Sequence, residues 1–199
     1  FFEYGYFQYG VPSFSTLGWG GGEEGQEDGE EGDPWEEARL EWTPFQHPEL
    51  GEVEIGGFRP YALVNPPAEE AAEMGPKQGE FLVKVAGMLP RVRFAETEVE
   101  GLGGGVFKVT AKVENAGFLP TSLQHGQRSR SVGPTFVQIQ VDDDAILSGA
   151  EKTTDVGVLS GSGGREEVTW IIRGREGSQV EIRLHSMKSG HDTATITLR

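Results

Sequence analysis

Four histidines are the side chains of this sequence best suited to metal chemistry: His47, His125, His185 and His191. A zinc peptidase needs two or three imidazoles and a carboxylate that converge on one metal, with an open position for water. Neither HxxE nor HExxH spacing occurs at any of the four. His47 begins an HPE turn, and His185 and His191 flank a predicted loop at residues 188–190. We therefore interpret them as surface histidines and assign no metal ligand.

Other segments resemble catalytic or ligand-binding motifs, but they lack some of the residues that those motifs require. Ser13 and Ser15 lack the GxSxG surroundings of a hydrolase nucleophile. The glycine-rich residues 101–105 do not precede a helical pattern, so they predict a hairpin turn and not a phosphate-binding loop. The three aspartates at residues 142–144 fit a solvated turn, with a cation site at a strand end as the alternative. The sequence thus shows no catalytic constellation.

Composition divides the chain near residue 90. The formal charge of the 199 residues is −15, and residues 1–90 hold 18 acidic and 4 basic side chains against 14 and 13 in residues 91–199. This balance argues against a nucleic-acid partner, because phosphates attract lysine and arginine. The absence of cysteine excludes disulfides and thiolate metal sites. No apolar run is long enough to span a bilayer.

The second half predicts an all-β domain. Apolar and polar residues alternate in short runs that are separated by clusters of Gly, Asn, Asp and Ser. These runs are residues 91–94, 106–113, 136–141, 168–172, 180–184 and 194–198. Trp170 is the predicted core anchor. About seven short strands with regular turns indicate an immunoglobulin-like β-sandwich at residues 91–199.

The first half is less regular. Residues 1–18 are rich in aromatic side chains, and residues 11–17 predict a short buried strand, either as part of a core or as the wall of a substrate pocket. Residues 19–33 form an acidic loop, which we expect to be mobile, with calcium binding as the alternative. Short helices are predicted at residues 33–41 and from Pro66, and an amphipathic helix at residues 78–89 that ends at Pro90. A turn and a strand are predicted within residues 47–57.

Several motifs resemble the zinc carboxypeptidases. The segment EYGY at residues 3–6 and the segment YGVPSFST at residues 9–16 resemble the late Asp-Trp-x-Tyr and Ser-Phe-Thr-x-Glu elements of that family. The segments HPELGEVEIGGF, VNPP, MLPRV and VENAGFLPT resemble a bacterial subgroup in which a β-sandwich follows the catalytic domain. The resemblance covers nearly the whole chain.

This resemblance implies a mixed fold, in which residues 1–90 are the C-terminal portion of an α/β carboxypeptidase-like domain and residues 91–199 are the sandwich. It implies a parent metallopeptidase, a hydrolase that binds zinc and removes C-terminal residues from peptide substrates outside the cytoplasm, in the periplasm or the extracellular space. The zinc ligands and the substrate-binding arginines would all precede Phe1, in an upstream catalytic segment. We therefore expect no cofactor in this chain.

One catalytic position of the family aligns within this chain. The general-base glutamate corresponds to Leu17, which cannot accept a proton from zinc-bound water. Either the parent is a catalytically impaired homologue, or a shift in register hides the base. The resemblance also implies that Phe2, Glu3, Tyr6 and Ser15 line the wall of the substrate pocket, and Phe2 hints at an apolar preference. The chain by itself is expected to be inactive in proteolysis.

Two further interpretations remain open. The sandwich could be a structural or docking module behind the peptidase-like domain. Alternatively, it could be a non-catalytic binding or adhesion module of a secreted protein, with a carbohydrate, a cell surface or another protein as its partner.

Overall fold

A computed structural model describes residues 2–16, 38–62, 64–66 and 68–199. Leu17, the acidic loop at residues 19–33 and the beginning of the helix predicted at residues 33–41 lie outside the described residues. The side chain of Phe2 lies outside them as well.

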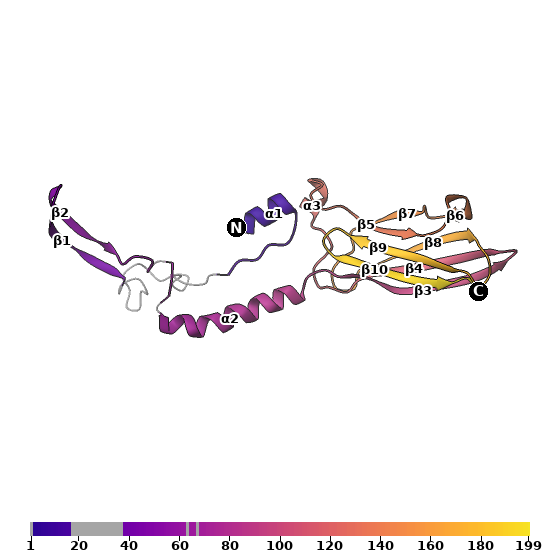
Figure 1. The fold of residues 1–199 in the computed structure, drawn as a ribbon, viewed down its shortest axis with the longest axis horizontal. Helices are drawn as coiled ribbons and strands as arrows, with labels where there is room; N and C mark the ends of the chain where they lie inside the picture. Colours follow the sequence, from indigo (N-terminus) through magenta and orange to yellow (C-terminus); the bar gives the residue numbers. More distant parts are fainter. Residues whose placement is uncertain (1, 17–37, 63, 67) are drawn as a thin grey trace. The chain divides into compact units, whose positions relative to one another are not determined.

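The second half of the chain forms two four-stranded antiparallel sheets (Figure 1). One sheet has the order β3-β4-β8-β6, with strands Val92–Gly103, Val106–Asn115, Arg165–Arg173 and Ile146–Gly149. The other has the order β10-β9-β5-β7, with strands Gly190–Thr197, Gln179–Ser186, Thr135–Ile139 and Thr153–Gly157. The short helix α3 (Gln124–Arg128) and the 3₁₀ turn η1 (Asp143–Ala145) lie in the connections.

A single hydrophobic core joins the two sheets into a β-sandwich. Val109, Trp170 and Ile172 from the first sheet and Ile139 and Ile182 from the second are fully buried in it. These residues alternate along their strands with exposed or half-buried ones, because successive side chains of a strand point to opposite faces. Trp170 is the core anchor that the sequence predicts.

The predicted strands of the second half are all present. One of them is longer than predicted, and two further strands occur. Strand β3 continues to Gly103, and the hairpin to β4 closes through Gly103, Gly104 and Gly105, all with positive φ, which confirms the predicted glycine turn. Strands β6 and β7 were not predicted. They are short edge strands of four and five residues, so their alternation is too brief to show in the sequence.

The buried strand predicted at residues 11–17 is not formed by its described part. Residues 2–9 are instead the helix α1 (Phe2–Tyr9), which ends at Gly10 with a φ of +63°. Residues 11–16 have no regular structure and are half-buried or exposed. Residues 11–16 pair with no strand in the described part of the chain, and a strand requires such a pairing neighbour.

The predictions between residues 38 and 90 need two corrections. Residues 39–41, predicted to end a helix, begin β1 (Arg39–His47), which pairs with β2 (Gly51–Phe58) in an antiparallel hairpin. The predicted strand within residues 47–57 is confirmed by β2. The two helices predicted from Pro66 and at residues 78–89 are one helix, α2 (Ala68–Gly87), with Pro76 inside it.

The described residues divide into two compact units, Phe1–Phe14 with Lys84–Arg199, and Ser15–Val83. Nearly all buried apolar side chains lie in the sandwich, and Ala38 is the one described before Val92. No described helix is long and apolar enough to cross a membrane.

Candidate functional site

Helix α1 is attached to the sandwich through α3. The ring of Tyr6 stacks on the imidazole of His125, with 5.0 Å between centroids and 22° between planes. The ring of Phe7 meets the same imidazole edge-on at 5.4 Å, and His125 Nε2 lies 3.1 Å from the Phe7 carbonyl oxygen. One histidine therefore contacts the rings of two adjacent aromatic residues and a backbone carbonyl.

Two glycines allow this approach. A Cβ atom at Gly10 would lie 2.3 Å from the Cα of Gly126, and a Cβ at Gly126 would lie 2.6 Å from the Gly10 carbonyl oxygen. Both distances are far shorter than real carbon contacts, so the two backbones touch only because neither residue has a side chain. The end of α1 is thus packed directly on α3.

The predicted pocket-wall residues are spread over this region and beyond it. Glu3 is exposed on α1, and Tyr6 is 38% exposed beside His125. Ser15 is exposed and belongs to the other unit. The role of Phe2, Glu3, Tyr6 and Ser15 in a substrate pocket stays a prediction.

Asn115, at the end of β4, connects several loops of the sandwich. Its side-chain Oδ1 accepts hydrogen bonds from the backbone N–H groups of Arg91 and Gly117, both at 3.0 Å. Its Nδ2 donates to the carbonyl oxygens of Leu119 at 2.8 Å and Ser160 at 3.2 Å. The residue is fully buried, and its four hydrogen bonds offset the cost of removing the amide from water.

The same segment fixes the end of α2 against the sandwich. A Cβ at Gly117 would lie 2.2 Å from the Leu89 carbonyl oxygen, so this loop packs on the backbone that leaves the helix. The Leu119 N–H donates to the Met88 carbonyl oxygen at 2.9 Å, and the Ala116 N–H donates to that of Arg91 at 2.8 Å. The motif at residues 113–121 therefore has a structural role at the junction between α2 and β3.

Glu114, beside Asn115, is a buried carboxylate between two arginines. Its Oε1 accepts from Arg93 Nε at 2.7 Å, and its Oε2 accepts from Arg165 Nε at 2.8 Å. A second nitrogen of each guanidinium group contacts the same oxygen as its Nε, so Oε1 is held by Arg93 and Oε2 by Arg165. The hydrogen bonds from Arg93 and then Arg165 lower the pKa of Glu114. The triad ties β3, β4 and β8 together.

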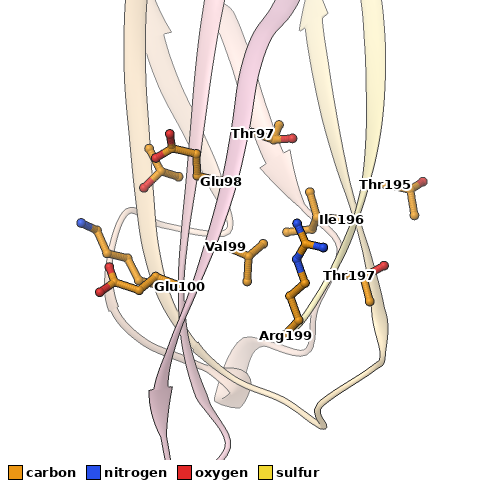
Figure 2. A pocket seen from close by; sticks show the side chains of 10 residues that line it. Thr97, Glu98, Val99, Glu100, Thr195, Ile196, Thr197 and Arg199 are labelled. Atoms are coloured by element: carbon orange, nitrogen blue, oxygen red, sulfur yellow. The ribbon is translucent and has the colours of Figure 1, made fainter.

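An opening of about 570 Å³ lies where the edge strands β3 and β10 face each other (Figure 2). Val99, Ile196 and the Arg199 side chain lie in the gap between the two strands, with Glu98 and Glu100 on one side and Thr195 and Thr197 on the other. Lys108, Thr97 and Thr110 complete the lining. Such a mixture of hydroxyls and opposite charges can hydrogen-bond a polar ligand, but it contains no imidazole, thiol or activated nucleophile.

The residues at the α1–α3 contact, at Asn115 and at Glu114 make packing contacts and hydrogen bonds. No group of three or more possible metal ligands occurs among the residues that the structure describes. The sequence identified Asn115 only as part of a turn. Its role depends on Arg91 and Ser160, whose distance along the chain hides the contact.

Residues 91–197 match the model of a protein family described as a domain of unknown function, DUF8731. The match covers more than half of the chain. The chain belongs to the DUF8731 family. The DUF8731 domain coincides with the sandwich from β3 to the end of β10 and includes Glu114, Asn115 and α3.

The other comparisons add little about function. No curated protein matches the chain. A GH3 β-glucosidase from Bifidobacterium adolescentis is 15% identical with a TM-score of 0.27, over 55% of this chain and 17% of that one. DesR, a β-glucosidase from Streptomyces venezuelae in complex with D-glucose, is 14% identical with a TM-score of 0.25, over 55% of this chain and 15% of that one. At these TM-scores the likeness carries no argument.

Proposed function

We propose that this chain is the C-terminal part of a zinc-carboxypeptidase-like protein, with an immunoglobulin-like DUF8731 domain as its structural support. In this proposal residues 1–90 complete an α/β catalytic domain, and the remainder of that domain supplies the zinc site and hydrolyses peptides from their C-terminal end. The chain by itself has no peptidase activity, and the protein acts in the periplasm or outside the cell.

The observation that carries the proposal is the contrast between the two halves. The sandwich buries a complete core, whereas large apolar side chains before residue 90 remain exposed. They include Tyr4, Phe7, Trp42, Ile55 and Leu82, which are between 51% and 64% exposed. Large apolar side chains with this exposure are found at interfaces, where the surface of a partner covers them. The surface of a larger catalytic domain would cover it.

The sandwich contacts residues 1–90 near both ends of that segment, and these contacts favour a structural role for the sandwich. His125 and Gly126 contact α1, and the segment around Asn115 and Gly117 contacts the end of α2. These contacts are made by backbone atoms and by the rings of Tyr6, Phe7 and His125. The domain would thereby hold the backbone at Gly10 and at Leu89, on either side of the first segment.

The test compares this chain with the longer protein that its gene encodes. Hydrogen exchange is measured on both, and peptidase activity is assayed on a panel of unblocked and C-terminally amidated peptides. We expect the amides of residues 39–58 and 68–83 to become protected in the longer protein, while those of β4 and β8 stay equally protected in both. An upstream sequence without HxxE and a later histidine, or unchanged exchange at residues 39–58, would falsify the proposal.

A binding module is the second candidate, and the opening between β3 and β10 is the observation that favours it. Its four threonine hydroxyls and its charged rim suit a polar ligand such as a carbohydrate. A glycan array probed with the whole chain tests this directly. Binding that is lost in both Thr97→Val and Thr195→Val variants would support this candidate, whereas no glycan signal removes it.

A further inference from the structure

His185 and His191 lie opposite each other on adjacent strands. Strands β9 and β10 are neighbours in the sheet (Figure 1). Their register pairs His191 with His185, next to the pair Gly190 and Ser186. The sequence separation of six residues suggested a loop between two independent surface histidines. In the structure both residues are within strands, and the loop is confined to residues 187–189.

Both imidazoles are on the outer face of the sheet. On β9 the residues Ile182, Leu184 and Ser186 are buried, so His185 points away from the core. His191 is its cross-strand partner and is therefore on the same face, and both histidines are exposed. Directly opposed residues of an antiparallel pair have Cβ atoms about 4.5–5.5 Å apart. Two imidazoles at this spacing can bind one metal ion at about 2.0–2.1 Å from each nitrogen.

Neighbouring charges do not compete for this position. The Lys188 ammonium lies over the Tyr9 ring, 5.1 Å from its centroid. The Arg183 guanidinium donates to Glu181 at 2.5 Å. The Asp192 carboxylate is engaged too, since its oxygens accept from the backbone N–H groups of Phe94 and Thr193, both at 2.8 Å. Water would therefore complete the coordination of a metal held by the two histidines.

We propose that His185 and His191 form a two-histidine site for a first-row divalent transition-metal ion on the outer face of the DUF8731 domain. Imidazole suits Cu²⁺, Ni²⁺ and Zn²⁺, and Cu²⁺ binds tightest in such sites. The site does not depend on the proposed function, because both ligands and both strands lie in the sandwich. It is also separate from the zinc centre that the carboxypeptidase resemblance implies upstream.

Calorimetric titration of the whole chain with NiCl₂ and, separately, CuCl₂ tests the proposal. We expect one equivalent to bind with micromolar affinity at about pH 7.5. Either His185→Ala or His191→Ala should weaken binding by ~10-fold or more, because a single imidazole remains.

His47→Ala is the matched control. His47 is also a surface histidine, whose Nδ1 accepts hydrogen bonds from the Glu49 and Leu50 N–H groups within its own turn. Its removal should leave the affinity unchanged. Three results would overturn the proposal. Neither metal binds, binding persists in both the His185→Ala and the His191→Ala variants, or binding disappears with His47→Ala. Both strand positions are exposed, so we expect the alanine variants to keep the circular dichroism spectrum of the folded wild type. If the spectrum changes, His185→Gln and His191→Gln are used in their place.

Discussion

Glu114 lies on β4 between arginines from the strands on either side. It pairs with Arg93, 21 residues earlier, and Arg165, 51 residues later, so the triad exists only once β3, β4 and β8 are aligned. The carboxylate is almost fully buried while both arginines stay largely exposed. Such a buried acceptor with charged donors is costly to leave incomplete.

Glu114→Gln should lower the free energy of unfolding by about 2 kcal/mol at pH 7. The pKa of Glu114 is lowered in the folded state, so its stabilising effect is complete above the ordinary carboxyl pKa and is lost as the pH falls through the folded pKa. The difference between wild type and variant should therefore shrink in acid. Urea unfolding at several pH values measures it. Glu176→Gln in the exposed turn before β9 is the control, and an equal loss there would contradict this role of the arginine pairs.

At the scale of elements, the connection between α2 and the sandwich depends on backbone contacts. Replacement of Gly117 by Ala brings a Cβ to 2.2 Å from the Leu89 carbonyl oxygen and 2.6 Å from the Pro90 Cα. Neither backbone atom can move without disturbing the bonds that Arg91 makes with Ala116 and Asn115. The close packing between α2 and the sandwich therefore requires a residue without a side chain at position 117.

We expect Gly117→Ala to destabilise the domain by roughly 1–3 kcal/mol, because the added methyl forces the backbone apart. Differential scanning calorimetry gives the change in unfolding midpoint. Gly87→Ala is a close control, since a Cβ there meets nothing within 4 Å and alanine favours the helix. If both variants unfold at the wild-type temperature, the contact of Gly117 with Leu89 does not contribute to stability.

At the scale of the whole molecule, the core is confined to one part of the chain. Every member of the buried cluster lies between Val92 and Leu198. A chain of residues 84–199 should therefore fold without the preceding residues and unfold in one cooperative transition. Trp170 is its single tryptophan and is fully buried, so its fluorescence reports the core alone. A red-shifted emission without a cooperative transition would show that the sandwich needs the first 83 residues.

The elements of the sandwich were largely predictable from local pattern. Period-two alternation and glycine turns identified β4, β5, β8, β9 and β10, and the position of Trp170 in the core, because a half-buried strand imposes its alternation on the sequence. The same reasoning failed for α1 and β1. Their apolar residues are mostly exposed and follow neither period strictly, so the local signal was ambiguous.

The sequence alone determined the longer strands of the sandwich, the change in charge near residue 90 and the lack of a catalytic motif. Tertiary structure decided which residues became neighbours: His191 with His185, Glu114 with Arg165, and Asn115 with Ser160. A strand's own residues determine which face is buried. Its register with another strand depends on the turns and packing of the whole domain, so contacts across the sheet cannot be read from either strand separately.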